Sequence, residues 1–593
     1  MVNNLTCCRG PGRKNLLPYS TGSGSPLAGE RVGATQPYVS TGPAMSPRSH
    51  VLTVVLEDYY HLSPFKGLIE RTSWHRFERR LEIGTHRALD MLDEFGVRAT
   101  FFVLGWVAET APELVREVAD RGHEVASKGY DHRSIREMSP ALFWEDIHRS
   151  REALEHATGR AVLGYRVADR WFGPKDLWGL DMLAQAGYRY DSSIKPMFRA
   201  FAEEPWRRFI HRHEGHSGSI WEVPVSSAEI LGLHVPVAGG NYFRQFPRGL
   251  VQRAIADWDR NVAAPFVMYF HTWELDPEQP RISSASLPAT IRQYRNLWRM
   301  ESMIREYLAK YSFHGIADHL GFRHEANLPP AGDAARPTRV TPRDLVIRTG
   351  QTSVSIVVPC YNEELALRYL SNTLQEVEEL LDPYYRIEFV LVDDGSQDRT
   401  HETLQRLFGE KPGCVIVHYE RNLGVTAAIL TGMRRASSEI VCSIDCDCTY
   451  DPRELRHMIP MLTDGVDLVT ASPCHPQGSV RNVPQWRLSL SKAASALYRR
   501  LTRQKINTYT SCFRVYRRKA ILDLDILEPG FLGIAEMIGK LDLRGGTIAE
   551  YPTTLESRVL GRSKMKTLRT ILGHLGVMGR LAWLRIRQRR NLS

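Results

Sequence analysis

The sequence has few cysteines and lacks any long hydrophobic run. Its nine cysteines leave residues 9–359 without one, and most of the others lie in strand-like segments of the second half. An odd number with this distribution does not suit a disulfide framework, so a reducing cytoplasm is favoured. No segment reaches the roughly 18 uninterrupted apolar residues of a membrane-spanning helix. The chain also has no basic start followed by an apolar stretch, so we expect no secretory signal.

Internal repeats are also absent, and 593 residues are too many for a single hydrophobic core. Residues 1–48, rich in Gly, Ser, Pro and Thr, are predicted to be disordered. Residues 323–352, which contain Pro and Gly but no periodicity, are predicted to be a linker. We therefore expect two folded blocks, residues 49–322 and 353–566, followed by a tail, residues 567–593.

The charge is unbalanced towards basic residues, with a formal net charge of +10 and a pI near 9.1. Such an excess suits nucleic acid, anionic lipid or a phosphorylated substrate. No recognisable nucleic-acid-binding module accompanies it, so we expect no nucleic-acid partner.

Both blocks alternate strand-length apolar runs with helical stretches. In the C-terminal block, "SVSIVVP", "RIEFVLVDD" and "EIVCSID" predict a doubly wound parallel sheet, whose ligands bind at the carboxyl ends of the strands. The N-terminal block has strand-like runs such as "HVLTVVLED", separated by helices around 84–95, 110–121, 141–157 and 286–310. Either an open sheet or an irregular α/β barrel would fit this second pattern.

Acidic residues follow three strands of the C-terminal block, in "PCYNEE", "VDDGSQDRT" and "IDCDCTYDP". Asp445 and Asp447, separated by one residue, can hold Mg²⁺ or Mn²⁺ between the protein and the diphosphate of a sugar nucleotide. Acids at strand ends can also simply cap helices, but three acidic loops in order along one sheet favour a binding site.

With these motifs the C-terminal block resembles the family 2 glycosyltransferases, in particular the dolichyl-phosphate mannose synthase-like branch. "RNLGVTAAILTGMRRA", "SCFRVYRRKAI" and "ESRVLGRSKMK" carry the resemblance further along the chain, over about residues 353–566. It implies a GT-A, Rossmann-like fold and an inverting transfer from a UDP- or GDP-sugar to a polyprenyl phosphate or a growing glycan.

The resemblance also implies roles for individual residues. Asp445 and Asp447 would bind the metal, whereas other matching residues would hold the nucleotide sugar: Pro359, Tyr361, Glu363, Asp393, Asp394, Arg558, Ser563, Lys564 and, more weakly, Arg481. Thr449 stands where the family has Gln, so the metal geometry is expected to differ. Glu536 would serve either as a general base or as an acid that orders a nearby basic group. A polyprenyl phosphate is already ionised near neutral pH and needs no strong base.

The tail, residues 567–593, mixes large apolar residues with six arginines and contains no acid. A segment of this kind can lie in an anionic membrane interface, which predicts a peripheral position at the inner face of the cell membrane. The alternative is a helix packed on its own domain with a solvated basic end.

The N-terminal block resembles the NodB-type polysaccharide deacetylases, across about residues 50–281. "TVVLEDYYH", "GHEVASKGYDHRS", "GYRVADRWF" and "YFHTWELDPEQPR" carry this resemblance in the expected order. It implies a distorted (β/α) barrel and a site that removes N-acetyl groups from amino sugars with Zn²⁺ or another divalent metal.

That chemistry needs a metal held by one aspartate and two histidines. The resemblance assigns two of the ligands to Asp58 and His132, the base to Glu57, the acid to His271 and the orientation of a carboxylate to Arg166. The third ligand position holds Lys128, whose ammonium cannot bind a metal while protonated.

Two interpretations of Lys128 remain open. Its ammonium could lie against Asp58 and replace the charge of the metal, leaving a sugar-binding domain without hydrolytic activity. Alternatively, it could be neutral and bind the metal, or water could complete a weakened site. The first is favoured, so we expect a glycosyltransferase fused to an inactive deacetylase-like domain. The alternatives are a bifunctional transferase and N-deacetylase, and a non-enzymatic glycan-binding protein.

Overall fold

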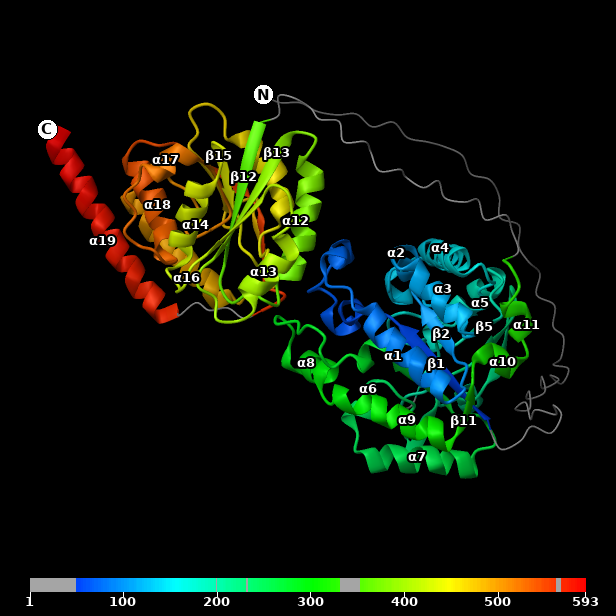
Figure 1. Cartoon of the computed structure of the whole chain (residues 1–593). Helices are drawn as coiled ribbons and strands as arrows, with labels where there is room; N and C mark the ends of the chain where they lie inside the picture. The colour runs from blue at the N-terminus through cyan, green and yellow to red at the C-terminus, as the bar shows by residue number, and fades with distance from the viewer. Residues whose placement is uncertain (1–48, 199, 231–232, 331–351, 562–566, 593) are drawn as a thin grey trace, which may run out of the picture. The chain divides into compact units, whose positions relative to one another are not determined.

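The structure is a computed structural model of the chain, and it describes residues 49–198, 200–230, 233–330, 352–561 and 567–592 (Figure 1). The segment predicted to be disordered, residues 1–48, lies outside the described residues, as does most of the predicted linker. The described residues include two large sheets with their helices, one sheet within residues 49–314 and the other within residues 352–552, and we refer to these parts as the N-terminal and C-terminal domains.

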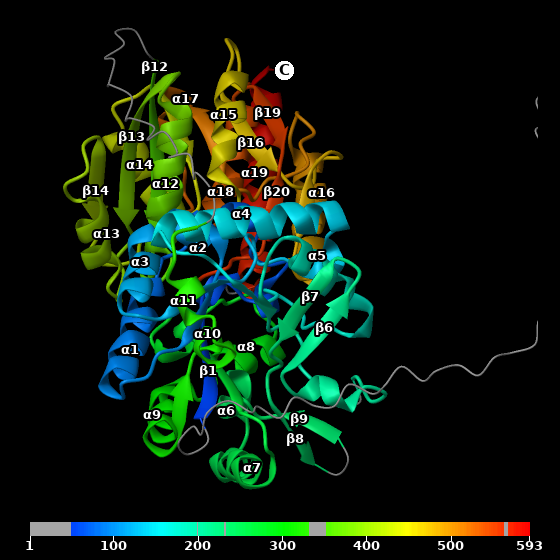
Figure 2. The same ribbon diagram turned by 90° about the vertical axis from the view of Figure 1, so that its right-hand side faces the viewer.

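One large sheet forms the centre of the N-terminal domain. Its strands are β1 (Ser49–Leu56), β2 (Thr100–Val103), β3 (Glu124–Ser127), β4 (Gly164–Tyr165), β5 (Tyr190–Asp191), β6 (His211–Gly215), β7 (Gly218–Glu222), β10 (Val267–His271) and β11 (Ser312–His314). They lie in the order β10-β1-β2-β3-β4-β5-β7-β6, with β11 also paired to β1. Only β6 and β7 pair in antiparallel fashion, side by side as Figure 2 shows. Within the described residues the two ends of this order do not pair, so the barrel is distorted as predicted.

Helices cover this sheet, and a separate hairpin joins β8 (Ser227–Ile230) to β9 (Leu233–Pro236). The helices are α1 (Leu81–Glu94), α2 (Gly105–Thr110), α3 (Pro112–Asp120), α4 (Pro140–Thr158), α5 (Trp178–Gln185), α6 (Asn241–Gln245), α7 (Arg248–Asn261), α8 (Leu287–Tyr294), α9 (Met300–Lys310), α10 (Ile316–Leu320) and α11 (Arg323–Ala326). The last of these lies within residues predicted as linker.

Strand β1 is mostly apolar because both of its faces are buried. Leu52 and Val54 belong to the main core under the helices, whereas Val51 packs with Phe102 and Val267 on the opposite face of the sheet. Side chains alternate between the faces of a strand, and a strand covered on both sides therefore needs apolar residues at nearly every position.

The helix predicted around 286–310 is broken into α8 and α9. Asn296 lies between them with φ 56°, a left-handed conformation that Asn tolerates better than most residues. Its side-chain amide donates a hydrogen bond to the carbonyl of Arg244 at 2.8 Å. A left-handed residue held by a tertiary hydrogen bond thus interrupts a helix that the apolar pattern alone would continue.

The C-terminal domain has a seven-stranded sheet in the order β14-β13-β12-β15-β18-β16-β19. Its strands are β12 (Thr352–Cys360), β13 (Tyr385–Asp393), β14 (Cys414–His418), β15 (Ile440–Ser443), β16 (Leu468–Ser472), β18 (Arg514–Arg517) and β19 (Ile548–Pro552), and a small separate sheet pairs β17 (Ser479–Arg481) with β20 (Thr554–Glu556). The sheet is parallel, as predicted, except at β18, which is antiparallel to both of its neighbours.

Helices pack on both faces of this sheet: α12 (Leu367–Leu381), α13 (Thr400–Phe408), α14 (Val425–Arg435), α15 (Leu455–Met458), α16 (Gln485–Leu501), α17 (Arg518–Leu522), α18 (Leu532–Leu543) and α19 (Thr567–Leu592). Helices α12 and α13 pack on one face, whereas α14 and α18 pack on the other (Figure 1). This double covering is the arrangement expected of a Rossmann-like GT-A domain.

Helix α19 packs against α16 and α18, with Val577, Met578 and Leu581 buried. A Cβ added to Gly539 of α18 would lie 2.4 Å from a methyl carbon of Leu581, so the two helices approach closely here. Among the residues that the structure describes, no helix is both long and apolar enough to cross a membrane.

Candidate functional site

The predicted transferase residues gather where β13, β12 and β15 end. These three strands are adjacent and parallel, so the residues that follow them meet at one edge of the sheet. Pro359 lies at the end of β12, with Tyr361 and Glu363 directly after that strand, and Asp393 ends β13. Ser563 and Lys564 lie outside the described residues.

Asp445 and Asp447 are held beside a basic residue. Burial raises the pKa of Asp445 to about 7, and the negative charge of Asp447 adds to the effect. Arg558 donates from Nε to Asp447 Oδ2 at 2.6 Å and from Nη1 to Glu363 Oε1 at 2.9 Å. Arg558 therefore bridges two acids from different loops. The backbone NH of Thr449 also donates to Asp447, at 3.2 Å.

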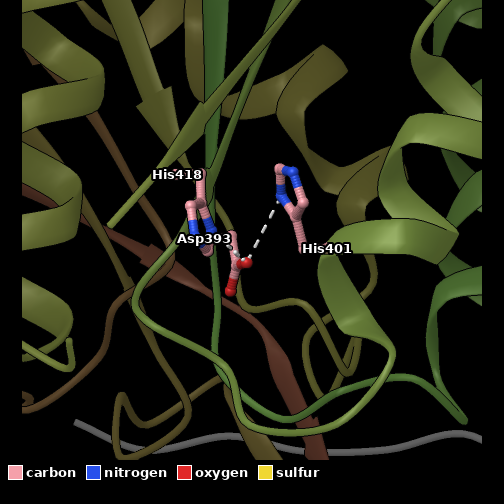
Figure 3. Close-up of side chains that lie close together, drawn as sticks. All are labelled: Asp393, His401 and His418. Carbon is pink, nitrogen blue, oxygen red and sulfur yellow. Dashed lines mark hydrogen bonds and ion pairs between the residues drawn. The ribbon is translucent and has the colours of Figure 1, made fainter. Parts of the chain in front are cut away.

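Asp393 is fully buried and contacts two histidines that the sequence analysis did not identify. His418 Nδ1 lies 2.8 Å from Asp393 Oδ2, and His401 Nδ1 lies 3.5 Å from the same oxygen (Figure 3). The three residues offer ligand atoms within 4.8 Å of one another, a set that could hold a metal ion. His418 is the last residue of β14, the strand next to β13. Its position at a strand end is therefore a signal in the sequence that could have identified it.

Three other predicted residues have mainly structural partners. Asp394 accepts hydrogen bonds from the backbone NH groups of Leu423 and Gly424, at 2.7 and 2.9 Å, and so fixes the loop before α14. Arg481 is exposed on β17, 3.7 Å from Glu556. Glu536 is buried in α18.

The carboxylate of Glu536 accepts from the backbone NH of Glu528 at 2.8 Å and forms an ion pair with Lys540, also at 2.8 Å. Of the two roles left open for Glu536, this geometry favours the ordering of a nearby basic group. Glu536 does not line the cavity that contains Asp445 and Asp447.

That cavity, of about 460 Å³, extends from the acidic pair into an apolar region. Asp445, Asp447 and Arg558 line one part of it. The remainder is lined mainly by apolar residues, among them Trp486, Leu490 and Leu497 of α16 and Leu575 and Met578 of α19. The tail thus contributes to a cavity of the transferase domain.

In the N-terminal domain, Glu57 is the centre of a buried polar cluster. Lys128 Nζ lies 2.5 Å from Glu57 Oε2, His132 Nε2 lies 3.2 Å from the same oxygen, and His271 Nδ1 lies 2.7 Å from Oε1. Burial opposes ionisation of Glu57, but Lys128 and the two histidines outweigh it and hold its pKa well below the usual value. Burial and the charge of Lys128 lower the pKa of His132.

The expected contact between Lys128 and Asp58 is not formed, because Asp58 is bound by backbone groups. Its carboxylate accepts from the backbone NH of Tyr59 at 2.9 Å and of Arg80 at 2.7 Å. Burial raises its pKa to about 7. Lys128 does place a positive charge beside an acid, as expected, but that acid is Glu57 and not Asp58.

Arg166 is fully buried and binds neutral groups rather than a carboxylate. It donates to the carbonyl and hydroxyl oxygens of Ser192, at 3.0 and 2.7 Å, and to the hydroxyl of Thr53 at 2.9 Å. Burial lowers its pKa to about 10. Among the described residues, the predicted role of orienting a carboxylate is therefore not observed.

The donor set at Glu57 does not fit a divalent metal. A site of this type needs three ligands that can donate electron pairs, whereas Lys128 Nζ donates a hydrogen bond to Glu57.

Comparison with protein families agrees with this division of the chain. Residues 70–190 match the polysaccharide deacetylase family, residues 192–320 match a domain of unknown function (DUF3473), and residues 355–524 match glycosyl transferase family 2.

Among individual proteins, the chain is 30% identical over 243 residues to the polyprenol monophosphomannose synthase of Mycolicibacterium smegmatis, spanning 40% of this chain and 85% of that protein. It is also 30% identical over 225 residues to the undecaprenyl-phosphate 4-deoxy-4-formamido-L-arabinose transferase of Serratia proteamaculans, which covers 37% of this chain and 64% of that transferase. The transferase from Pseudomonas syringae is matched over 48% of its length, at 33% identity.

Solved structures overlap with each domain at low similarity. A Mycobacterium smegmatis protein, provisionally described as a polysaccharide deacetylase, covers 50% of this chain and is itself covered over 98%, with 22% identity and a TM-score of 0.32. Glucosyl-3-phosphoglycerate synthase of Mycobacterium tuberculosis was solved with Mn²⁺ and uridine diphosphate. Its match covers 39% of this chain and 81% of that protein, with 22% identity and a TM-score of 0.31. Scores at this level add nothing to the assignment. The motifs, the site geometry and the similarity to the mannose synthase together show that the chain belongs to the family 2 glycosyltransferases, with a polysaccharide deacetylase domain preceding the transferase domain.

Proposed function

We propose that the chain transfers a sugar, with inversion, from a UDP- or GDP-sugar to a polyprenyl phosphate. One observation carries this proposal. Acidic and basic side chains line one part of the cavity in the transferase domain, whereas apolar side chains of α16 and α19 line the rest. A phosphate with a long hydrocarbon chain has matching chemistry, whereas a free glycan would need polar groups along the whole cavity. The relatives named for polyprenol and undecaprenyl-phosphate support the same acceptor class.

The acidic pair fits a divalent metal such as Mg²⁺ or Mn²⁺. Asp445 and Asp447 present carboxylate oxygens, which are the ligands that these ions prefer. A metal bound there would neutralise charge on the donor diphosphate. In the proposed site Arg558, which binds Asp447, would also contact a phosphate group.

In the proposed reaction an acceptor phosphate oxygen attacks the anomeric carbon of the sugar. A bond forms between this oxygen and the carbon, and the bond to the donor diphosphate breaks, so that a nucleoside diphosphate leaves with the bonding electrons. Because the phosphate oxygen is already ionised near neutral pH, no side chain has to remove a proton. The position of Glu536, held within α18 by Lys540 and backbone NH groups, is consistent with this.

We further propose that the deacetylase-like domain binds sugar without hydrolysing it. The ion pair between Lys128 and Glu57 occupies the cluster where the related enzymes would need a metal. An active deacetylase would make the chain bifunctional, and that alternative predicts acetate release by the full-length protein.

The transferase proposal is tested with labelled UDP- and GDP-sugars, polyprenyl phosphate and Mg²⁺ or Mn²⁺. We expect a labelled product that partitions into organic solvent, and its loss in Asp445→Asn/Asp447→Asn. The exposed Asp464 provides a matched control, and Asp464→Asn should retain activity. Lipid-linked product formed at the parental rate by the double variant would contradict the site. Labelling of a water-soluble glycan alone would contradict the acceptor.

The hydrolysis question is answered by metal content and acetate release, measured on the full-length protein with N-acetylated oligosaccharides. We expect the deacetylase-like domain to bind no stoichiometric metal and to release no acetate. The double variant Asp445→Asn/Asp447→Asn is used for the metal measurement, because it removes the metal that the transferase site would bind. Acetate release that is abolished by Glu57→Gln would establish the bifunctional alternative.

A further inference from the structure

A second large cavity lies in the N-terminal domain beside Glu57. Its volume is about 750 Å³, within the range of roughly 300–1,000 Å³ typical of small-molecule sites. Aromatic side chains form much of its wall: Trp171, Tyr242, Tyr269 and Trp273. Flat rings of this kind can pack against the apolar faces of sugar rings.

Lys195 is buried in this wall in an unusual environment. Its side chain is 5% exposed, and its Nζ lies 3.2 Å from Tyr242 Oη and 3.3 Å from Tyr269 Oη. The same nitrogen lies 4.9 Å from the ring centroid of Trp171 and 4.2 Å from that of Tyr242. Among the described residues, no carboxylate forms an ion pair with Lys195. A buried amine without an opposite charge is costly to ionise, because burial removes its hydration.

The other ionic groups of the cavity leave an excess of positive charge. Three cations are balanced by acids, since Lys128 pairs with Glu57, Lys66 with Asp169 at 3.4 Å, and Arg244 with Glu274 at 2.8 Å. The cavity is also lined by Lys195, Arg166, Arg170 and Arg292, which form no ion pair with a carboxylate within the described part of the chain. An anionic ligand would supply the missing negative charge.

We propose that this cavity binds an acidic sugar, with its carboxylate or phosphate group beside Lys195 and its ring against the aromatic wall. The inference rests on the proposed sugar-binding role of the domain and adds the charge of the ligand and the residue that selects it. A sugar carried on a polyprenyl phosphate, the product proposed for the transferase, has a phosphate on its anomeric carbon and belongs to this class.

The two family matches contribute different parts of the cavity. Residues 70–190, the deacetylase match, provide Lys128, His132, Arg166 and Trp171. Residues 192–320, the match to a domain of unknown function, provide Lys195, Tyr242, Tyr269 and Arg292. The second segment thus completes the wall of the cavity and supplies Lys195, the amine that forms no ion pair with a carboxylate in the described part of the chain.

The ionisation of Lys195 links ligand binding to pH. Burial, followed by the charges of Arg292 and Arg166, holds the pKa of Lys195 well below its usual value. Tyr242 and Tyr269 are the other titratable groups facing it, and burial raises the pKa of both. An anion favours the ammonium form, so the affinity should fall as the pH rises through the pKa of Lys195.

The test is calorimetric titration of the full-length protein with four probes: glucose 1-phosphate, glucuronate, glucose and N-acetylglucosamine. We expect at least tenfold tighter binding of an acidic probe than of its neutral counterpart, and a decrease in the affinity for the acidic probe as the pH is raised. The two acidic probes distinguish a phosphate from a carboxylate ligand. The transferase donor site is kept out of the comparison by using Asp445→Asn/Asp447→Asn as the background.

Lys195→Met should remove this preference, lowering the affinity for the acidic probe at least tenfold while leaving that for the neutral sugar unchanged. Lys175 is exposed in the same domain, so Lys175→Met is the matched control. Arg292 is exposed on α8, and Arg292→Ala should weaken anion binding even if Lys195→Met fails to fold.

Equal binding of acidic and neutral sugars, or an anion preference that survives both Lys195→Met and Arg292→Ala, would overturn the inference and leave a neutral sugar-binding domain. Absence of binding by all four probes would overturn both this inference and the proposed sugar-binding role, whereas the transferase proposal has its own assay.

Discussion

At the scale of single residues, the ionic partner of Lys128 determines the chemistry of the N-terminal domain. Glu57 and Asp58 are adjacent in the sequence, yet Glu57 contacts Lys128 and two histidines while Asp58 binds the backbone of residues 59 and 80. The sequence showed that a ligand had been replaced by a cation. It could not show which of two neighbouring acids the cation would neutralise, because consecutive side chains at a strand end point in different directions.

The Lys128–Glu57 pair should contribute to stability in a pH-dependent way. Because the folded pKa of Glu57 lies well below its usual value of 4.5, its stabilising effect is present above that value and is lost as the pH falls through the folded pKa. In Lys128→Met, burial would instead raise the pKa of Glu57, so stability should increase as the pH falls from neutral. Removing one partner of a buried pair costs about 3–5 kcal/mol.

Thermal unfolding of the full-length protein between pH 4 and 8 measures this effect, with Lys175→Met as the control. The double variant Lys128→Met/Glu57→Gln should recover part of the lost stability, since no buried charge is left unpaired. A melting temperature of Lys128→Met equal to that of the parent at pH 7 would show that the pair is not stabilising.

Arg558, which binds Asp447 of the acidic pair, is expected to contribute to transfer. It bridges Asp447 and Glu363, and removing a charged group that contacts a reacting phosphate typically lowers the rate about 10²–10³-fold. We expect Arg558→Ala to show such a decrease in the polyprenyl phosphate assay, and Arg406→Ala, at an exposed position of α13, to show none. Full activity of Arg558→Ala would exclude a role for this side chain in transfer.

At the scale of elements, helix α19 packs on its own domain and also exposes apolar side chains. Val577, Met578 and Leu581 pack on the transferase domain, as the alternative of a docked helix predicted. The same helix leaves Leu572 63% and Trp583 58% exposed, with Leu575 and Ile586 also exposed. Apolar residues beside exposed Arg587 are the combination that can enter an anionic lipid surface.

Vesicle flotation tests the exposed face of α19. We expect the parent to bind vesicles containing anionic lipid, and Leu572→Ser/Trp583→Ser to bind them more weakly, because less apolar area would enter the interface. Trp298 is 70% exposed in the other domain, so Trp298→Ser serves as the control. Flotation of the α19 variant to the same extent as the parent would place any membrane contact elsewhere.

At the scale of the whole molecule, segments that match two different families share one chain, and we propose a reaction for the transferase domain alone. The acidic pair, Arg558 and the apolar part of the cavity are all present in the transferase domain. In the deacetylase-like domain a Lys–Glu pair stands where a metal would be required. We therefore expect the acyl group of the transferred sugar to survive.

Mass spectrometry of the lipid-linked product checks this expectation. With an N-acetylated donor sugar that the transferase accepts, the product should keep the mass of the acetyl group after prolonged incubation with the full-length protein. A time-dependent loss of 42 mass units, roughly the mass of the removed acetyl group, that requires Glu57 would show that the chain performs both reactions in series.

The sequence by itself determined the two domains, the order of their motifs and the position of the acidic pair, because strand-length apolar runs and the residues that end them are local patterns. Tertiary structure decided which side chains meet. In the folded domains Lys128 pairs with Glu57 rather than Asp58, and His401 and His418 lie beside Asp393. Lys195 is enclosed between residues of α6 and β10. These contacts depend on side-chain direction and on strands far apart in the chain, and no local pattern specifies either.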